Sequence, residues 1–159
     1  MADIAHRDFT KSLVALLKET FEGPGGNTYL DKGAGLFQTL DVLTAKEASH
    51  VPYVGAQTIA AHCAHLAYYV RVNHNGMMGR EQQLDWPSSW RPQQVGDREW
   101  EELKGGVRRE YDALIETLDS LETWSDQQAG DSMAIVAHTA YHLGAIRHVL
   151  KNVGPLLGR

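Results

Sequence analysis

The sequence predicts an all-α fold, an up-down four-helix bundle formed by a single domain over residues 1–159. Three observations lead to this prediction. Four long segments repeat apolar residues at steps of three and four, which is the period of an amphipathic helix. No segment alternates apolar and polar residues in the way a half-buried strand does, and no unit is repeated along the chain. A chain of 159 residues is also long enough to bury one core of ordinary size.

The four helices have recognisable ends. We expect the first over Ile4–Phe21, because the run Gly23-Pro24-Gly25 that follows it continues a helix poorly. The others are expected over Ala56–Gly76, Asp97–Leu121 and Gly130–Asn152. In the third helix, apolar residues alternate steps of three and four, which is typical of the seam of left-handed bundles.

Two connections between these helices are long. A short helical stretch over Leu36–Glu47 and a loop over Ser49–Gly55 lengthen the first crossover. The connection between the second and third helices, residues 76–97, contains Trp86 and Trp90. Structureless loops longer than about 12–15 residues tend to be functional or disordered. Because two tryptophans argue against disorder, we expect this loop to pack over another part of the molecule.

Charge and composition exclude several classes of function. The net charge is −5 and the basic residues are scattered, so the sequence shows no nucleic-acid-binding patch. No run approaches the roughly 18 apolar residues of a membrane span, and the first residues lack an apolar signal core, so we expect a cytoplasmic protein. The single cysteine, Cys63, excludes an intrachain disulfide and a multi-cysteine zinc site, and we expect it in the core.

Histidines are the most informative residues of the last helix. At about 100° per residue, His138 and His142 fall inside its apolar arc, one turn apart, whereas His148 falls outside. Two buried imidazoles without partners would cost about 1–3 kcal/mol each. A shared metal ion would satisfy both, and so would hydrogen bonds to carbonyl groups or to tyrosine and serine side chains.

The second helix offers two candidates for a third ligand. His62 lies nearer the centre of its apolar face, whereas His65 lies at the edge of that face beside Tyr69, so the pattern slightly favours His62. Two known metal templates do not apply. No glutamate follows His138 as in His-Glu-x-x-His. The Glu-x-x-His of di-iron bundles is also missing at the candidate ligands, because Ile135 precedes His138, Ile59 precedes His62 and His62 precedes His65 by three residues. The remaining histidines are expected at the surface: His6, His50 and His74.

Three segments give the chain a family resemblance. They are TIAAHCAHLAYY at 58–69, VGDREWEELKGGVRREYDALIETL at 95–118 and AHTAYHLGAIRH at 137–148. In their order and spacing they resemble the DinB-like (DinB/YfiT-like) superfamily of metal-binding four-helix bundles. Each motif is weakly specific alone, but their order and spacing on three helices are more specific, and the resemblance extends over most of the chain.

The resemblance implies a set of site residues. In its register the metal ligands are His65, His138 and His142, with His62 as their neighbour. It also implies a close-packing glycine in the last motif, Gly144, and a homodimer formed through the bundle faces. Many members have glutamine at the next position, where this chain has Ala145.

Three neutral imidazoles with an open position are the layout of a catalytic metal site. Imidazole ligands suit zinc, nickel, iron or copper, and we expect one divalent zinc, nickel or iron ion. The resemblance implies transfer of a low-molecular-weight thiol, such as bacillithiol or mycothiol, to a small electrophile. Metal-dependent hydrolysis is the alternative, although no acidic residue in a motif beside the ligands offers a general base. A non-catalytic metal-binding or interaction module is the third reading.

Residues near such a metal site are candidates for lining a substrate pocket. The candidates, besides His62, are the aromatic residues of the second helix and of the long loop. The alternative for each of them is packing in the core or under the loop. These aromatic residues are Tyr68, Tyr69, Trp86 and Trp90.

Overall fold

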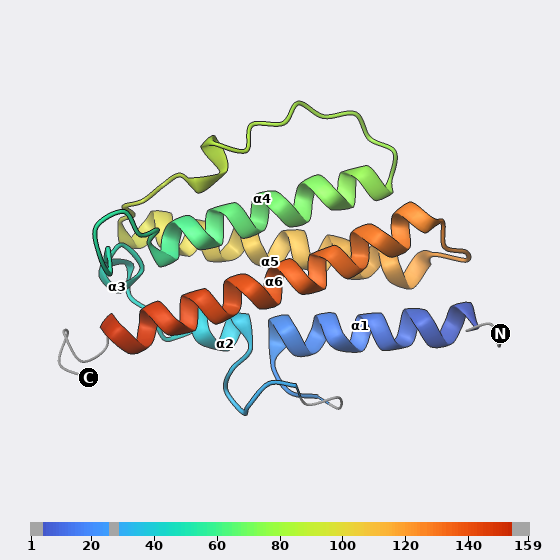
Figure 1. Cartoon of the computed structure of the whole chain (residues 1–159), viewed down its shortest axis with the longest axis horizontal. Helices are drawn as coiled ribbons and strands as arrows, with labels where there is room; N and C mark the ends of the chain where they lie inside the picture. Colours follow the sequence, from blue (N-terminus) through green and yellow to red (C-terminus); the bar gives the residue numbers. More distant parts are fainter. Residues whose placement is uncertain (1–4, 26–28, 154–159) are drawn as a thin grey trace.

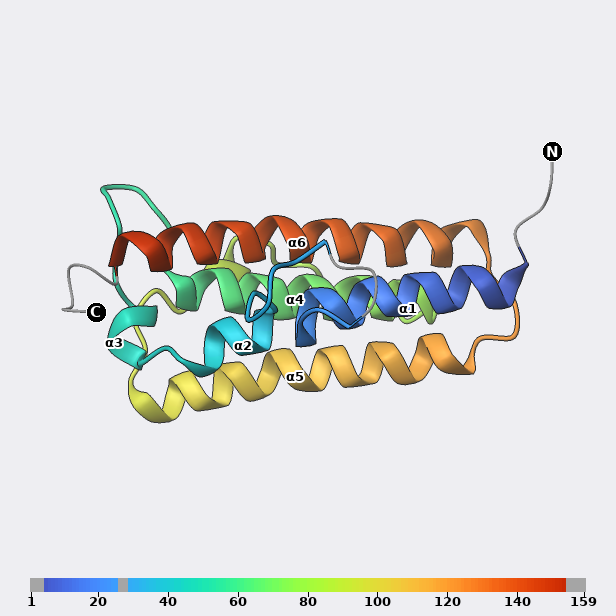
Figure 2. The ribbon, with the colours of Figure 1, turned by 90° about the horizontal axis from the view of Figure 1, so that it is seen from below.

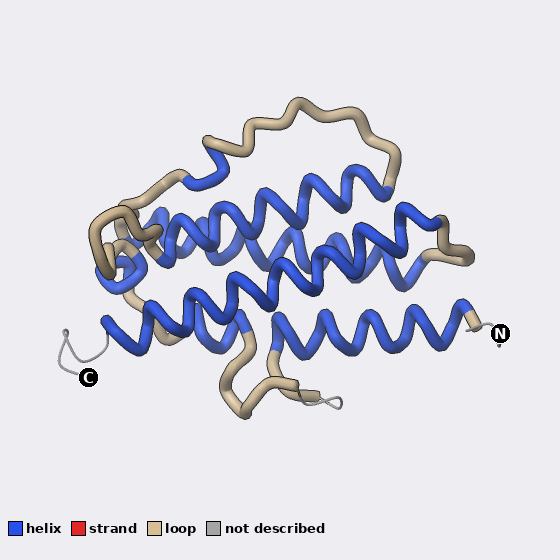
Figure 3. The backbone as a smooth tube through the Cα atoms, in the orientation of Figure 1, coloured by secondary structure: helices blue, strands red, loops and turns tan. Residues whose placement is uncertain are grey.

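Four long helices lie side by side along one axis in the computed structural model, which describes residues 5–25 and 29–153 (Figures 1 and 2). Short helical segments interrupt the connections between them, and the described residues contain no strand (Figure 3). The prediction of an all-α bundle is therefore confirmed. The long helices are α1 (His6–Glu22), α4 (Ile59–Met77), α5 (Asp97–Ser120) and α6 (Asp126–Val153), and the short segments are α2 (Leu36–Asp41), α3 (Ala45–Ala48) and the 3₁₀ helix η1 (Ser88–Trp90).

The long helices do not alternate in direction as the up-down prediction required. At one end of the bundle Thr58, just before α4, donates a 3.0 Å hydrogen bond to the carbonyl of Gln93, just before α5. At the other end His74 Nε2 of α4 lies 2.7 Å from Thr117 Oγ1 of α5. These two helices therefore run parallel, and the up-down order is wrong for this pair.

The long loop makes this parallel arrangement possible. Residues 78–96 run back alongside α4 and return the chain to the end where α4 began (Figure 1). An extended chain advances about 3.3 Å per residue, against 1.5 Å in a helix, so the loop easily spans α4, which has 19 residues. Helix α6 then runs antiparallel to α4, and Gln128 Nε2 near its start donates to the carbonyl of Met77 at the end of α4 (3.4 Å).

Side-chain caps set two helix starts that differ from the prediction. The hydroxyl of Thr58 accepts the backbone N–H of Ala61 at 3.2 Å, so α4 begins at Ile59 and not at Ala56. Ser125 Oγ accepts the N–H of Gln128 at 3.1 Å, and the side chain of Gln128 accepts the N–H of Ser125 at 2.9 Å. This reciprocal cap starts α6 at Asp126, so the predicted start at Gly130 lies inside the helix. The predicted start of the first helix, Ile4, lies outside the described residues.

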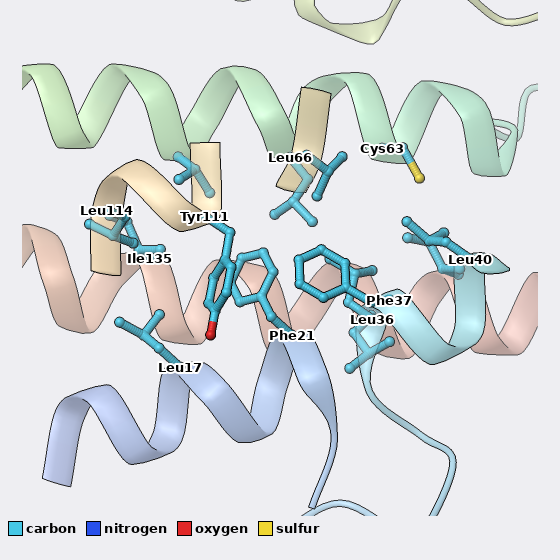
Figure 4. Close-up of a cluster of buried hydrophobic side chains, with 14 of the residues drawn as sticks. Leu17, Phe21, Leu36, Phe37, Leu40, Cys63, Leu66, Tyr111, Leu114 and Ile135 are labelled. Atoms are coloured by element: carbon cyan, nitrogen blue, oxygen red, sulfur yellow. The ribbon is translucent and has the colours of Figure 1, made fainter. Parts of the chain in front are cut away.

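The core lies between the four long helices and α2. Phe21 of α1 stacks on Tyr111 of α5 with ring centroids 4.6 Å apart, and Phe37 of α2 meets Tyr111 edge-on at 5.3 Å (Figure 4). Trp100 closes one end of the core, where its Nε1 donates to the carbonyl of Leu43 at 2.9 Å. Cys63 is fully buried in this cluster, as predicted.

Gly144 is exposed, and a Cβ added to it meets no atom within 4 Å, so the prediction of a close-packing glycine is wrong within the described chain.

None of the described helices combines the length and the apolar character that crossing a bilayer requires.

Removing the cap of α4 should destabilise the bundle. In Thr58→Ala both the cap of Ala61 and the bond to Gln93 are lost, so we expect the free energy of unfolding in urea to fall by about 1–2 kcal/mol. Thr58→Ser keeps the hydroxyl and should lose less than half of that amount. Equal losses in the two variants would show that the methyl group, and not the hydroxyl, stabilises this helix start.

Candidate metal centre

Three histidines from two helices converge on one point. His65 comes from α4, and His138 and His142 come from successive turns of α6. One ring nitrogen of each lies within 4.8 Å of the corresponding nitrogen of the other two. His65 and His142 are 7% and 2% exposed and His138 is half-buried. No other group of this kind occurs among the residues that the structure describes.

The hydrogen bonds of His65 fix its tautomer. Its Nδ1 lies 2.7 Å from Ser89 Oγ, and that hydroxyl donates to the carbonyl of Trp86 at 2.6 Å. Because the single hydroxyl proton of Ser89 is used on this carbonyl, Nδ1 of His65 must be the donor to Ser89. The proton of the neutral ring is thus on Nδ1, and the lone pair of Nε2 is free. Metal-binding histidines are commonly oriented in this way.

His62 supports His142 and is not itself a member of the triad. The Nδ1 atoms of the two rings are 2.9 Å apart, so one donates to the other. When His142 is the donor, its Nε2 is left with a free lone pair, as in His65. The ring of His62 then accepts through Nδ1 and holds that of His142 in place. The group that could hold an ion includes His65 and not His62, which the sequence pattern slightly favoured.

The long loop explains why His65 is buried although it lies at the edge of the apolar face of α4. The indole of Trp90 stacks on His65 with centroids 4.0 Å apart and planes 8° from parallel. Ser89, beside it in η1, supplies the hydrogen bond described above. The prediction that this loop packs over another part of the molecule is confirmed, and what it covers is the histidine triad.

The other predicted pocket residues lie at different distances from the triad. Tyr69 stacks on His138 with centroids 3.6 Å apart and planes 12° from parallel. Tyr68 does not reach the triad; its hydroxyl accepts the backbone N–H of Asp85 at 2.7 Å, and its ring meets Trp86 edge-on at 5.1 Å. Trp86 lies 6.2 Å from His65, measured between ring centroids. Tyr69 and Trp90 therefore contact the triad, whereas Tyr68 and Trp86 contact each other where the loop passes α4.

Burial keeps the imidazoles neutral. Desolvation lowers the pKa of His138 to about 4 and that of His142 to about 3, and nearby histidines add to both shifts. Burial also lowers the pKa of His65 and of His62. Neutral imidazole is the form that binds a metal.

One polar atom of the triad has no partner. Nε2 of His138 is buried and makes no hydrogen bond, which costs about 1–3 kcal/mol in a folded protein. A metal ion shared with His65 and His142 would satisfy it. The donor set, its protonation state and this unpartnered atom therefore fit a divalent metal ion.

Other histidines are satisfied by the protein alone. His74, predicted at the surface, is 6% exposed, and its ring bonds to Thr117 across the α4–α5 contact. That prediction was wrong because α5 covers the end of α4. His6 is half-buried and its Nε2 donates to the carbonyl of Leu121 at 3.0 Å. Burial raises the pKa of the Cys63 thiol, so this cysteine stays protonated in the core.

The fold and the site together define an all-helical bundle with a buried three-histidine cluster able to hold a metal ion. No family model, no curated protein and no solved structure matches the chain.

The depressed pKa values make the stability of the metal-free protein depend on pH. An unfolded imidazole has a pKa of about 6.5, so between about pH 6.5 and pH 4 the unfolded chain binds more protons than the folded one. Stability should therefore fall as the pH is lowered through this window. We expect the urea midpoint to drop less between pH 7 and pH 4.5 in the double variant His138→Gln/His142→Gln. An equal drop in both proteins would contradict these shifts.

Removal of the Ser89 hydroxyl should weaken metal binding without removing a ligand. In Ser89→Ala the ring of His65 loses the partner that fixes its tautomer, and such losses cost about 10- to 100-fold in metal affinity. Zinc affinity can be measured by competition with a chromophoric chelator. Ser88→Ala is the matched control, since Ser88 bonds to Asp85 and makes no bond to a triad histidine. An unchanged affinity in Ser89→Ala would show that the serine does not orient His65.

Proposed function

We propose that this chain is a DinB-like divalent-metal-binding protein, active as a homodimer, whose metal centre serves the transfer of a low-molecular-weight thiol to a small electrophile. The resemblance of the three sequence segments supports the assignment. The observation that carries it is the convergence of three imidazole nitrogens within 4.8 Å, with Nε2 of His138 buried and unpartnered.

His65, His138 and His142 would hold the ion. When bound, a divalent ion supplies Lewis acidity that lowers the pKa of a coordinated thiol or water. Imidazole donors suit zinc, nickel or iron, and Cys63 offers no sulfur ligand because it is buried in the core cluster.

The surrounding side chains orient the ligands and keep water away from them. Ser89 and His62 each bond to Nδ1 of a ligand ring. Trp90 and Tyr69 each cover the face of a ligand ring. Rings fixed in this way are preorganised for one coordination geometry.

The composition of the site favours thiol transfer over hydrolysis. The group that could hold the metal contains no aspartate or glutamate among the described residues, so none of its own members is a carboxylate that could serve as a general base for water. Free in solution, a thiol ionises near pH 8.5 and water near 15.7, so at the same ion the thiol is the more readily ionised nucleophile. In the transfer, the thiol proton goes to solvent and a bond forms from sulfur to the electrophilic carbon. The leaving group departs with the electron pair of the broken bond.

Elemental analysis tests the metal centre directly. We expect close to one divalent ion per chain in the wild type and almost none in His65→Ala and His138→Ala, because each loses one of three ligands. His50→Ala, which changes a histidine outside the triad, should keep its metal, and circular dichroism checks that every variant folds. A wild type that stays metal-free after dialysis against zinc and nickel would overturn the proposal.

The chemistry is tested with the metal-loaded protein. 1-Chloro-2,4-dinitrobenzene with a panel of small thiols should give metal-dependent thioether formation that His138→Ala loses. Metal-dependent hydrolysis of p-nitrophenyl acetate without thioether formation would favour the hydrolase instead. Stoichiometric metal without turnover in either assay would overturn the enzymatic part of the proposal.

A further inference from the structure

A groove of about 830 Å³ lies beside the metal centre. It is formed between the start of α4, with the loop before it, and the last turns of α6, at the end of the bundle where α3 lies (Figure 1). Its volume falls within the range of about 300–1,000 Å³ that is typical of small-molecule sites. The residues that line it are Pro52, Tyr53, Gly55, Ala56, Gln57, His62, Trp90, Tyr141, Ala145, His148, Val149 and Asn152.

Two residues of the lining connect the groove to the triad. His62 lies 2.9 Å from His142 between Nδ1 atoms, and Trp90 stacks on His65 at 4.0 Å. A molecule in the groove therefore contacts the side chains that hold two of the three ligands. The groove and the metal centre are therefore adjacent, with His62 and Trp90 in contact with both.

Exposed aromatic rings form much of the wall. Tyr53 and Tyr141 are 70% and 72% exposed, which is high for tyrosines, and Trp90, also in the lining, is half-buried and stacks on His65. Aromatic side chains interact favourably with another ring when it stacks or meets them edge-on. The wall thus offers contact area to a flat ring.

The two amides of the lining present one free donor and one free acceptor. The side-chain oxygen of Gln57 accepts from Gln93, so its NH₂ group remains to donate. The NH₂ group of Asn152 donates to the carbonyl of His148 at 2.8 Å, so its oxygen remains to accept. A hydroxyl group both donates and accepts, and it therefore suits either of these amides.

Charge is missing from the groove. Its described lining contains no lysine, arginine, aspartate or glutamate. Arg147 of α6 lies outside the lining and bonds instead to Thr39 at 3.2 Å and to the carbonyl of Gly33 at 3.4 Å. Without a bound ion, a carboxylate that entered the groove would lose hydration and meet no lysine or arginine, which disfavours anionic ligands.

We propose that this groove binds the uncharged organic part of the substrate, a flat ring that carries a hydroxyl group, beside the metal centre. Its role in turnover rests on the proposed function, whereas binding in the groove does not require the metal. The inference narrows the substrate class: a neutral, ring-bearing molecule fits the groove, and a thiol or electrophile with carboxylate groups near the ring does not.

A matched pair of probes tests the charge preference. 4-Nitrobenzyl alcohol and 4-nitrobenzoate share a ring that quenches tryptophan fluorescence, and Trp90 lies in the lining. In titrations of the wild type at pH 8, after any metal has been removed with a chelator, we expect saturable quenching with the alcohol binding about tenfold more tightly than the carboxylate. Equal or tighter binding of the carboxylate would overturn the proposal.

Variants locate the binding. Ala145→Phe should fill the groove and abolish binding of the alcohol, and Tyr141→Ala should weaken it about two- to tenfold through the loss of a ring contact. Met133→Ala, which changes an exposed residue of α6 outside the lining, should bind as the wild type does. Binding that Ala145→Phe leaves unchanged, with its fold intact by circular dichroism, would place the probe elsewhere and overturn the proposal.

The same titration of His138→Ala separates the two proposals. Binding of the alcohol to this variant supports the groove independently of the ion. If the wild type also proves metal-free, the metal function fails while the groove stands. Loss of binding in a folded His138→Ala would contradict a groove that forms without the metal.

Discussion

The antiparallel packing of α4 against α6 is the contact on which the site depends. The two helices contribute Leu66, Ile135 and Ile146 to the core cluster, and none of these side chains is exposed. Burial of each such side chain contributes about 1.5–3 kcal/mol, so these contacts and not the histidines fix how the helices align. Once the apolar side chains have aligned α4 and α6, the positions of His138 and His142 on α6 bring them opposite His65 on α4. Burial of the core side chains thereby offsets two costs in free energy. One is the cost of keeping the buried imidazoles neutral, and the other is the cost of leaving Nε2 of His138 without a hydrogen-bond partner.

The direction of α5 decides what covers the site. Because α4 and α5 run parallel, the chain must return along α4 before α5 can begin (Figure 1). That return brings η1 over the exposed edge of α4, where Ser89 bonds to His65 and Trp90 stacks on it. A short turn between antiparallel helices would leave His65 facing solvent. The long loop is thus a direct consequence of the topology, and it supplies one half of the environment of the site.

Helical periodicity predicted the long helices and the inward placement of His138 and His142. Both histidines lie on one helix, so the apolar spacing of that helix alone shows that they are on its buried face. It could not choose His65 over His62, because an irregular loop buries His65 and no periodic pattern reports that loop. It missed His74 for a related reason, since a neighbouring helix covers the end of α4. The direction of α5 also leaves no trace in apolar spacing. The early start of α6 did have a signal, the Ser125-x-x-Gln128 pattern of a reciprocal cap ahead of a polar first turn.

Neutrality links the triad and the groove. A site built from carboxylates cancels part of the charge of a bound dication, whereas three neutral imidazoles leave that charge intact. In the proposed function, the ion therefore favours a partner that becomes anionic there, as a thiol does on losing its proton. The groove favours an uncharged molecule instead, because its described lining contains no lysine, arginine, aspartate or glutamate to balance a charge on the bound molecule. The two requirements are met by a reaction in which negative charge is created only at the ion while the rest of the substrate stays neutral.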